Sequence, residues 1–283
     1  MPDGRLRRGL TTLPCRLFTS EATVDLDDSA SELTVTPTWK TKALRAALLT
    51  AAELGLPSLR GVLTVTSSIE VSLGFGSSTS DVTASIRAVL NAFGGELEHG
   101  RIARLAVAAE SAADPLMFDE MVLFAHREGQ LIESFGTTLP PIAVLGFPLG
   151  IGPVDTLSLP RARYDAQEIR HFDELRVHLR CGALAGDLAT IGRVATQSAR
   201  LNQRFLPVPL FDDLMGVARR TGAAGLQIAH SGSIGGILFD PASPEHAHAA
   251  VRTEKELSAI GIDDCWYYVE EPEPVRPLIG SAD

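Results

Sequence analysis

The sequence predicts an α+β fold built from two sub-domains. β-like runs alternate with amphipathic helix patterns through the first half, and helical patterns dominate the start of the second half. Between the halves, residues 148–153 combine two prolines with two glycines, which is typical of a hinge. A chain of 283 residues is long enough for one large domain or two ordinary ones. We expect one sub-domain over residues 1–150, a second over 151–270 and an extended tail over 271–283.

In the first half, β-branched residues and alternation predict strands, and one-sided apolar patterns predict helices. Two strands are expected over residues 17–26 and 32–36, followed by a helix over 42–54 that stops at Gly55. A strand near Val62 leads into a loop rich in glycine and serine, and a helix with one apolar face follows that loop. The remaining elements expected here are a helix over 97–109 and strands over 121–125, 131–135 and 142–147.

The second half begins with helical patterns and then returns to strands. The expected elements, in order, are helices over 166–181, 184–201 and 210–220, strands over 225–229 and 236–239, a helix over 244–260 and a strand over 265–269. The tail over 271–283 is rich in proline and begins with acidic residues, so we expect it to be extended.

Composition excludes several classes of protein. A formal net charge of −10 and the lack of a basic cluster argue against a nucleic-acid surface. The most apolar stretch, residues 142–154, is broken by proline and glycine and cannot span a bilayer. Three cysteines far apart in the sequence fit reduced thiols, so we expect a cytoplasmic protein. With only three lysines, a phosphate site must rely on backbone amides, hydroxyls, arginine and a metal ion.

The stretch over residues 71–81 is the most informative part of the chain. It lies between the strand near Val62 and a helix, and a helix that opens in this way offers unpaired amides and a favourable dipole to an anion. Gly74 and Gly76 permit close approach of the backbone to a phosphate. Ser77 and Ser78 add hydroxyl groups for phosphate or Mg²⁺. The stretch therefore predicts a nucleotide-phosphate loop.

Two better-known loops are excluded. A Walker loop requires Gly-Lys-Ser/Thr after its glycines, but no lysine lies between Lys42 and Lys255. A Rossmann loop requires a third glycine where Thr79 stands. The plain alternative is that the glycines form a turn and Ser77 caps the helix.

Three segments resemble motifs of one family, the GHMP small-molecule kinases. The glycine loop is similar to that family's second motif, Pro-x-x-x-Gly-Leu-Gly-Ser-Ser-Ala-Ala, and residues 229–239 are similar to its glycine-rich third motif. Residues 110–127 and the run Ser-Ser-Thr-x-Asp over 77–81 resemble the L-threonine kinase branch, which serves cobalamin side-chain assembly. The similarity runs from about residue 14 to residue 268. It implies a ribosomal-S5-like half followed by a ferredoxin-like half, with ATP and Mg²⁺ as cofactors.

The resemblance also implies roles for individual residues. The phosphate cradle is expected from Gly74, Gly76, Ser77, Ser78 and Thr79. One hydroxyl and one carboxylate suffice for Mg²⁺, and the resemblance assigns them to Ser78 and Glu110.

On the acceptor side, Asp114 is the candidate general base, with Asp119 as the alternative. Asp114-Pro115 is also a plain turn signal, so both interpretations stay open. Ser231 and Gly232 are expected to approach the substrate, and the glycines of the third motif are expected to let this segment pack against the phosphate loop. His230, as a lone histidine between strands, is expected to be a structural hydrogen-bonding residue.

The sequence departs from the family at two places. The first motif, similar to Pro-Gly-x-Cys-Gly-Glu in the threonine-kinase branch, is absent, and Glu70 stands where the second motif usually has proline. The leading expectation is an ATP-dependent kinase of the hydroxyl group of a small, amino-acid-like substrate, with L-threonine first. The alternatives are a catalytically silent relative that binds nucleotide or metabolite, and a kinase of a hydroxylated intermediate in a specialised pathway. The expected partners are a small-molecule substrate, no nucleic acid and no membrane, with a homodimer left open.

Overall fold

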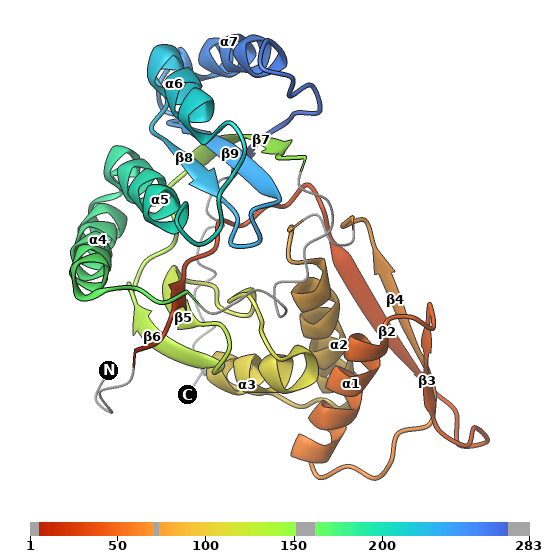
Figure 1. The fold of residues 1–283 in the computed structure, drawn as a ribbon. Helices are drawn as coiled ribbons and strands as arrows, with labels where there is room; N and C mark the ends of the chain where they lie inside the picture. Colours follow the sequence, from red (N-terminus) through yellow and green to blue (C-terminus); the bar gives the residue numbers. More distant parts are fainter. Residues whose placement is uncertain (1–5, 71–73, 151–161, 271–283) are drawn as a thin grey trace, which may run out of the picture.

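The computed structural model describes residues 6–70, 74–150 and 162–270 (Figure 1). In the first half, the strands β2 (Ser20–Leu26), β3 (Leu33–Thr36) and β4 (Gly61–Ser67) form a sheet in the order β2-β4-β3. β2 and β4 are antiparallel, and β3 and β4 are parallel. The parallel pair requires a crossover, and the helix α1 (Thr41–Glu53) supplies it.

Two more helices pack with α1 to form the core of the first half. They are α2 (Ser77–Phe93) and α3 (His99–Glu110), and the buried faces of α2 and α3 share one apolar cluster. A second cluster joins α1 to the strands β3 and β4. A small antiparallel sheet, β1 (Gly9–Leu10), β5 (Val122–Ala125) and β6 (Gln130–Ser134), completes this half.

The second half contains an antiparallel sheet with helices on both faces. Its strand order is β10-β7-β9-β8, made of β10 (Trp266–Glu270), β7 (Ile142–Pro148), β9 (Ile234–Phe239) and β8 (Gly225–Ile228). Alternate residues of β7 and β9 enter two different apolar clusters. One cluster includes α4 (Ala166–Ala185) and α5 (Leu188–Asn202), and the other includes α6 (Phe211–Thr221) and α7 (His246–Ser258) (Figure 1). Burial on both faces explains why β7 and β9 read as continuous apolar runs.

Almost every element predicted from the sequence is present, with ends that differ by a few residues. The exceptions are β1, which is too short to give a pattern, and the segment over 17–19, which precedes β2 rather than belonging to it. The tail over 271–283 and part of the predicted hinge lie outside the described residues. The sub-domain boundary near residue 150 stays a prediction, but β7 precedes it and already pairs with strands of the second half.

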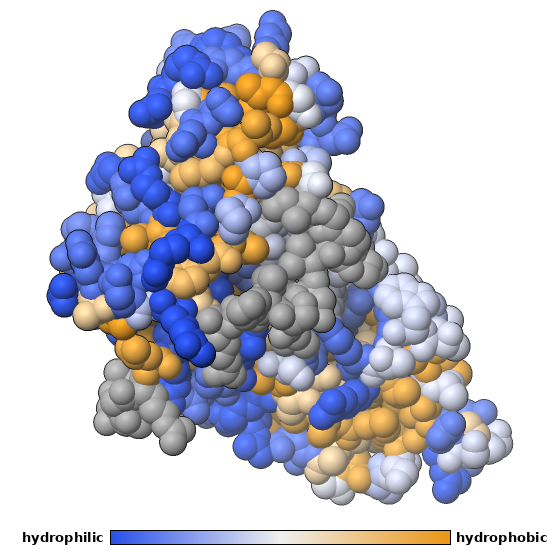
Figure 2. All heavy atoms as spheres, viewed as in Figure 1, coloured by the Kyte–Doolittle hydropathy of each residue, from blue (hydrophilic) through white to orange (hydrophobic). Residues whose placement is uncertain are grey.

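Apolar residues reach the surface in both halves. In Figure 2 they are visible near α1 in the first half and near α6 in the second, with hydrophilic residues around them. The exposed apolar side chains in the first half include Trp39, Leu48 and Val62. No helix within the described ranges is long and apolar enough to cross a bilayer.

Candidate active site

Helix α2 begins directly after the glycine loop, as the sequence predicts. Gly76 is its N-cap residue with φ 71°, and Gly74 has φ 88°, so both lie in the left-handed region that favours glycine. No side chain caps the helix, so the alternative in which Ser77 is the cap is wrong. Because a helix leaves its first amides without intrahelical partners, the start of α2 can bind an anion. Residues 71–73 of the predicted loop lie outside the described residues.

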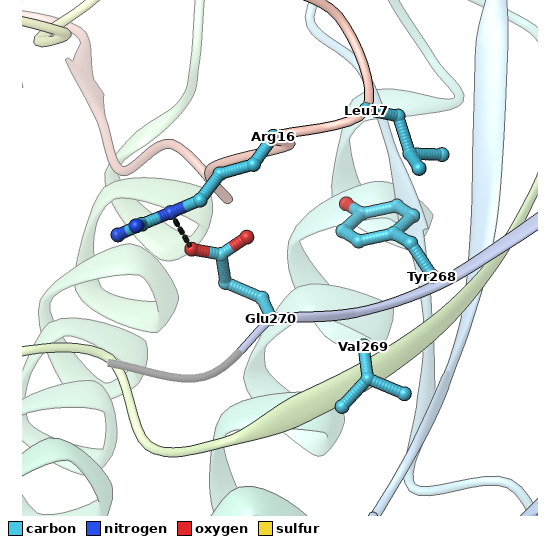
Figure 3. Close-up of a pocket in the computed structure, with 5 residues that line it drawn as sticks. All are labelled: Arg16, Leu17, Tyr268, Val269 and Glu270. Carbon is cyan, nitrogen blue, oxygen red and sulfur yellow. Dashed lines mark hydrogen bonds and ion pairs between the residues drawn. The ribbon is translucent and has the colours of Figure 1, made fainter. Parts of the chain in front are cut away.

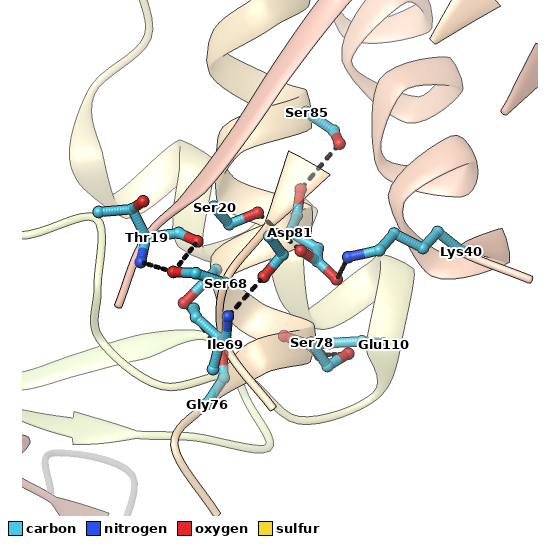
Figure 4. A network of polar contacts seen from close by, with 12 residues as sticks. Thr19, Ser20, Lys40, Ser68, Ile69, Gly76, Ser78, Asp81, Ser85 and Glu110 are labelled. Atoms are coloured by element: carbon cyan, nitrogen blue, oxygen red, sulfur yellow. Dashed lines mark hydrogen bonds and ion pairs between the residues drawn. The ribbon is translucent and has the colours of Figure 1, made fainter. Parts of the chain in front are cut away.

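Two hydroxyl groups of α2 converge on one carboxylate at the end of α3. Ser78 Oγ donates to Glu110 Oε2 over 2.5 Å, and Thr79 Oγ1 donates to Glu110 Oε1 over 2.7 Å. Figure 4 shows Ser78 beside Glu110. Glu110 is only 5% exposed, although it is the last residue of its helix. The fold thus brings together the two residues that the resemblance assigns to Mg²⁺.

Burial sets the proton affinity of this carboxylate. It raises the pKa of Glu110 to about 7, against the lowering effect of the Ser78 and Thr79 hydroxyls and of the Lys42 charge. A carboxylate that is buried without a paired cation is costly, so a metal ion beside it would relieve that cost. The burial of Glu110 is therefore a reason to expect a cation at this place.

Asp114 lies against the glycine loop. Its backbone amide donates to Thr79 Oγ1 over 3.2 Å, and a Cβ atom added to Gly76 would lie 2.9 Å from Asp114 Oδ2. On its other side, Asp114 Oδ1 lies 3.7 Å from His230 Nε2. Burial raises the pKa of Asp114, and the nearby His230 opposes that shift. The alternative residue, Asp119, has a side chain that is 86% exposed and lies 3.6 Å from His99 at the start of α3.

The third motif packs against the phosphate loop, as expected. A Cβ atom at Gly74 would lie 2.5 Å from Ser231 Oγ and 2.7 Å from Ser233 Oγ, so only glycine fits there. The two serine hydroxyls are 2.7 Å apart. Gly232 has φ 78° in the turn before β9 and faces Leu206. Ser231 therefore lies beside the loop that the sequence assigns to phosphate, whereas Gly232 contacts Leu206 instead.

The last two glycines of the third motif have a different neighbour from the one expected. Gly235 and Gly236 belong to β9 and pair with β7 and β8. A Cβ atom at Gly235 would lie 2.6 Å from the Phe147 ring, and one at Gly236 would lie 3.1 Å from Val144. These two glycines make room for large side chains of β7 inside the sheet, and they do not face the phosphate loop.

Sequence reasoning missed a buried ion pair beside the site. Lys40 Nζ lies 2.6 Å from Asp81 Oδ2, and Ser20 Oγ donates to Asp81 Oδ1 over 2.6 Å. Figure 4 shows Asp81 between Lys40 and Ser20, on the second turn of α2. The sequence singled out one partner, because Asp81 ends the Ser-Ser-Thr-x-Asp run, but it gave no signal for the pairing with Lys40.

An aromatic contact ties the phosphate loop to the second half. The ring of Phe75, between the two loop glycines, has its centroid 5.0 Å from that of Phe18 and 5.0 Å from that of Trp266. Trp266 belongs to β10, and its ring covers Gly146 of β7. The second motif of the family has leucine in place of Phe75, and the larger ring here reaches both neighbours.

A separate pocket of about 270 Å³ lies between β10 and the segment before β2 (Figure 3). Arg16 Nε lies 2.6 Å from Glu270 Oε1 at this pocket, and the remaining lining residues are Leu17, Tyr268 and Val269. No residue that the sequence assigns to the site lines it. We therefore place the candidate chemistry at the glycine loop and not in this pocket.

The residues around Glu110 fit a magnesium ion. Ser78 and Glu110 offer oxygen atoms only, and Mg²⁺ in proteins is held by one or two carboxylates, with water and substrate phosphates completing the shell. Across the part of the chain that the structure describes, no group of three or more His, Cys, Asp or Glu side chains could hold a metal ion. The three cysteines are also unpaired. The donor set thus suits a hard cation rather than a soft one.

Solved structures of small-molecule kinases have the same fold as this chain. A homoserine kinase from Cytophaga hutchinsonii is 21% identical, with a TM-score of 0.67 and coverage of 93% of this chain and 87% of that one. The L. major mevalonate kinase, solved in complex with R-mevalonate, is 17% identical with a TM-score of 0.63, covering 90% and 87%. These likenesses show the fold.

The chain belongs to the GHMP kinase family. The model of the GHMP kinases N terminal domain matches residues 41–118, and that of the GHMP kinases C terminal matches residues 180–256, together more than half of the chain. Members of this family are phosphotransferases that use ATP, generally with Mg²⁺.

Two curated relatives are L-threonine kinases. That of Salmonella typhimurium is 29% identical over 179 residues, and that of Citrobacter freundii is 29% identical over 182 residues. Each match takes in 62% of this chain, and 59% and 61% of the two relatives. The chain thus spans about three fifths of the length of the curated relatives it matches.

Proposed function

We propose that this chain is an ATP-dependent kinase that transfers the γ-phosphoryl group of ATP to the hydroxyl of a small, amino-acid-like substrate, with L-threonine as the first candidate. The relatives at 29% identity support the choice of L-threonine. The observation that carries the proposal is the convergence of Ser78, Thr79 and Glu110 beside a glycine loop that Asp114 contacts. Phosphoryl transfer asks a protein for positioning and charge neutralisation. In this proposal the loop and helix start provide the positioning, and the Mg²⁺ that Ser78 and Glu110 would hold provides the neutralisation.

Each element of the site has a part in that reaction. The first amides of α2 and the loop glycines bind the phosphates of ATP. Ser78 and Glu110 would hold Mg²⁺, which neutralises charge on the phosphates when bound. Thr79 holds Glu110 and the backbone of Asp114 in place through its single hydroxyl.

In this proposal, Asp114 orients the acceptor hydroxyl and takes its proton. Its Oδ2 faces Gly76 at the start of α2, and a raised pKa makes its carboxylate a better proton acceptor. The acceptor oxygen then forms a bond to the γ-phosphorus, and the bond from that phosphorus to the bridging oxygen breaks as ADP leaves. The nearness of Ser231 to Gly74 supports a role for its hydroxyl in contacting the acceptor.

The experiment that tests this function is ADP release with Mg²⁺-ATP across a panel of hydroxy amino acids and amino alcohols. We expect turnover that depends on L-threonine. Ser78→Ala and Glu110→Gln should each lower kcat by about 100-fold while leaving the far-ultraviolet circular dichroism spectrum unchanged. Ser258→Ala, at the end of α7, is the matched control and should turn over like the parent.

The possible results separate the alternatives. Turnover with another acceptor would keep the mechanism and change the substrate. Absence of turnover with every acceptor, together with measurable ATP binding, would favour the catalytically silent relative. Full turnover in both Ser78→Ala and Glu110→Gln would show that the metal site is wrongly assigned.

A further inference from the structure

His230 lies at the meeting point of the phosphate loop and the acceptor side. It belongs to the turn between β8 and β9, directly before Ser231. Its Nε2 atom lies 3.7 Å from Asp114 Oδ1. The other carboxylate oxygen of Asp114, Oδ2, is the one near Gly76. The Asp114 carboxylate thus has the imidazole at one oxygen and the glycine loop at the other. A histidine that served only to close the β8–β9 turn would have no need of this carboxylate.

A second histidine packs behind the first. The ring centroids of His126 and His230 are 5.7 Å apart, and the His126 carbonyl accepts the Ala113 amide over 2.9 Å, next to Asp114 in the chain. His126 is 7% exposed, and its Nδ1 atom has no hydrogen-bond partner among the described residues. Three ionisable side chains, from the turn after β5, the loop after α3 and the β8–β9 turn, therefore form one partly buried cluster beside the phosphate loop.

The charges around this cluster act on it in known directions. Burial lowers the pKa of His230 below its usual range; the charge of Asp114 opposes this shift, and the positive charges of Arg8 and Arg127 add to it. Burial, His230 and the same arginines lower the pKa of His126 to about 4, so its ring is neutral at pH 7. The charge of His230 acts to lower the pKa of Asp114. The charge of Asp114 in turn acts to raise the pKa of Glu110 on α3.

We propose that His230 is a positioning residue for Asp114, holding Oδ1 so that Oδ2 stays directed at the acceptor hydroxyl beside the phosphate loop. The inference rests on the proposed kinase function and adds a residue to it. In the transfer step, the hydroxyl proton moves to Asp114 Oδ2 as the oxygen–phosphorus bond forms. The electron pair of the broken phosphorus–oxygen bond leaves with ADP. His230 does not contact the reacting atoms, and its neighbour His126 supports the ring from behind.

Substitutions that separate the polar contact with Asp114 from the shape of the side chain test this role. His230→Leu removes the contact with Asp114, whereas His230→Gln keeps a donor near the position of Nε2. We expect His230→Leu to lower kcat by about 10-fold to 100-fold with the KM for ATP within twofold of the parent. His230→Gln should recover part of that loss. His248→Gln, a change of an exposed histidine on α7, is the matched control and should leave both constants unchanged.

The pH profile gives a readout that a merely structural role would not move. A protonated His230 favours the Asp114 carboxylate, so its loss should shift the acidic limb of kcat/KM to higher pH. A kcat and an acidic limb in His230→Leu that match the parent would overturn the proposal. Equal losses in the Leu and Gln variants would also overturn it.

A measurement without turnover keeps this test independent of the proposed function. The imidazole ¹⁵N shifts of His230 can be titrated in the parent and in Asp114→Asn, with circular dichroism to show that both are folded. We expect a lower pKa for His230 in Asp114→Asn, because the carboxylate that favours its protonated form is gone. An unchanged pKa would refute the pair even if the protein proved inactive on every acceptor. A lowered pKa of His230 in a protein that is inactive on every acceptor would support the interaction of His230 with Asp114 and refute only the proposed kinase function.

Discussion

At the scale of single residues, the site depends on a carboxylate that is expensive to bury. Glu110 ends α3 inside the protein, and a carboxylate at the C-terminal end of a helix is opposed by the helix dipole. Two hydroxyls from α2 compensate only in part, since the pKa of Glu110 remains raised to about 7. This is the pattern of a residue kept for function at a cost in stability.

The raised pKa of Glu110 predicts a pH-dependent loss of stability in the absence of metal. Between pH 4.5 and about 7 the folded chain keeps a proton on Glu110 that the unfolded chain releases, so the free energy of unfolding falls as pH rises and is flat above pH 7. The shift corresponds to about 3 kcal/mol. Urea unfolding in EDTA from pH 5 to pH 8 should show this fall in the parent and a smaller one in Glu110→Gln.

The control for this prediction is Glu128→Gln, which changes an exposed glutamate after β5. Its stability should follow the parent at every pH. Parallel curves for the parent and Glu110→Gln would show that Glu110 does not carry the proton. Added Mg²⁺-ATP should oppose the loss above pH 7, because a bound cation favours the ionised carboxylate.

At the scale of elements, helix α2 connects the phosphate loop to the rest of the first half. Left-handed glycines flank both of its ends, Gly76 with φ 71° at the N-cap and Gly94 with φ 61° at the C-cap. The surroundings of the two differ, because a Cβ atom at Gly76 meets Asp114 whereas one at Gly94 has nothing within 4 Å. A substitution at Gly94 therefore tests backbone strain alone, whereas the same substitution at Gly76 adds a clash with Asp114.

Gly76→Ala and Gly94→Ala should cost similar stability but differ in activity. Each forces alanine into the left-handed region, at about 1 kcal/mol. Only Gly76→Ala displaces the Asp114 carboxylate, so only this variant should lose kcat/KM, by at least about 10-fold. Urea unfolding and steady-state kinetics on both variants check this. An active Gly76→Ala would mean that the position of Asp114 is not required.

The pair Lys40–Asp81 joins two elements below the site. Lys40 precedes α1, Asp81 lies on α2, and both side chains are buried. The hydroxyl of Ser20, the first residue of β2, donates a second hydrogen bond to Asp81. This contact fixes α2, and with it the phosphate loop, against the beginning of α1.

Breaking this pair should be costly, and removing both charges should be less so. Lys40→Met or Asp81→Asn alone leaves an uncompensated buried group and should lower the free energy of unfolding by about 3 kcal/mol. The double variant should recover about 2 kcal/mol relative to additivity. Arg101→Met, which removes the more exposed Arg101–Glu53 pair between α3 and α1, should cost less than about 1 kcal/mol. Additive losses at Lys40 and Asp81 would contradict a coupled pair.

At the scale of the whole molecule, the two halves meet at the phosphate loop. Phe75 of the loop contacts Trp266 of β10, and Gly74 of the loop contacts Ser231 and Ser233 of the third motif. The N-terminal segment before β2 also lies on β10, as Arg16 and Leu17 show beside Tyr268 and Glu270 in Figure 3. The Tyr268 hydroxyl donates to the Pro14 carbonyl over 3.3 Å. The halves therefore share the site as well as a boundary.

The chain contains two tryptophans, which allow a test of this meeting point. Trp266→Leu removes the contact with Phe75 and should lower the free energy of unfolding by about 2 kcal/mol and weaken ATP binding. Trp39→Leu is the matched control. Trp39 is 59% exposed and its ring lies 5.0 Å from Lys40 Nζ, so the loss of this contact should cost less than about 1 kcal/mol and leave ATP binding unchanged. Equal stability and ATP affinity in the two variants would contradict a role for Trp266 in holding the loop.

The sequence by itself determined the order of the elements and the class of the site. Periodicity gave the helices and strands from α1 to β10 within a few residues, because alternation and one-sided apolar faces reflect burial directly. The glycines and hydroxyls of 74–79 indicated an anion loop, and the resemblance to GHMP kinases added Glu110, Asp114 and Ser231. Each of these residues lies within reach of the loop.

Only the tertiary structure decided which distant side chains meet. The pairing of Lys40 with Asp81, the contact of His230 with Asp114 and the packing of Phe75 on Trp266 all join residues far apart in the chain. Local pattern holds no information on such contacts, because they depend on how sheets and helices pack. The same limit applies to Gly235 and Gly236, whose neighbours are strand side chains that the motif did not reveal.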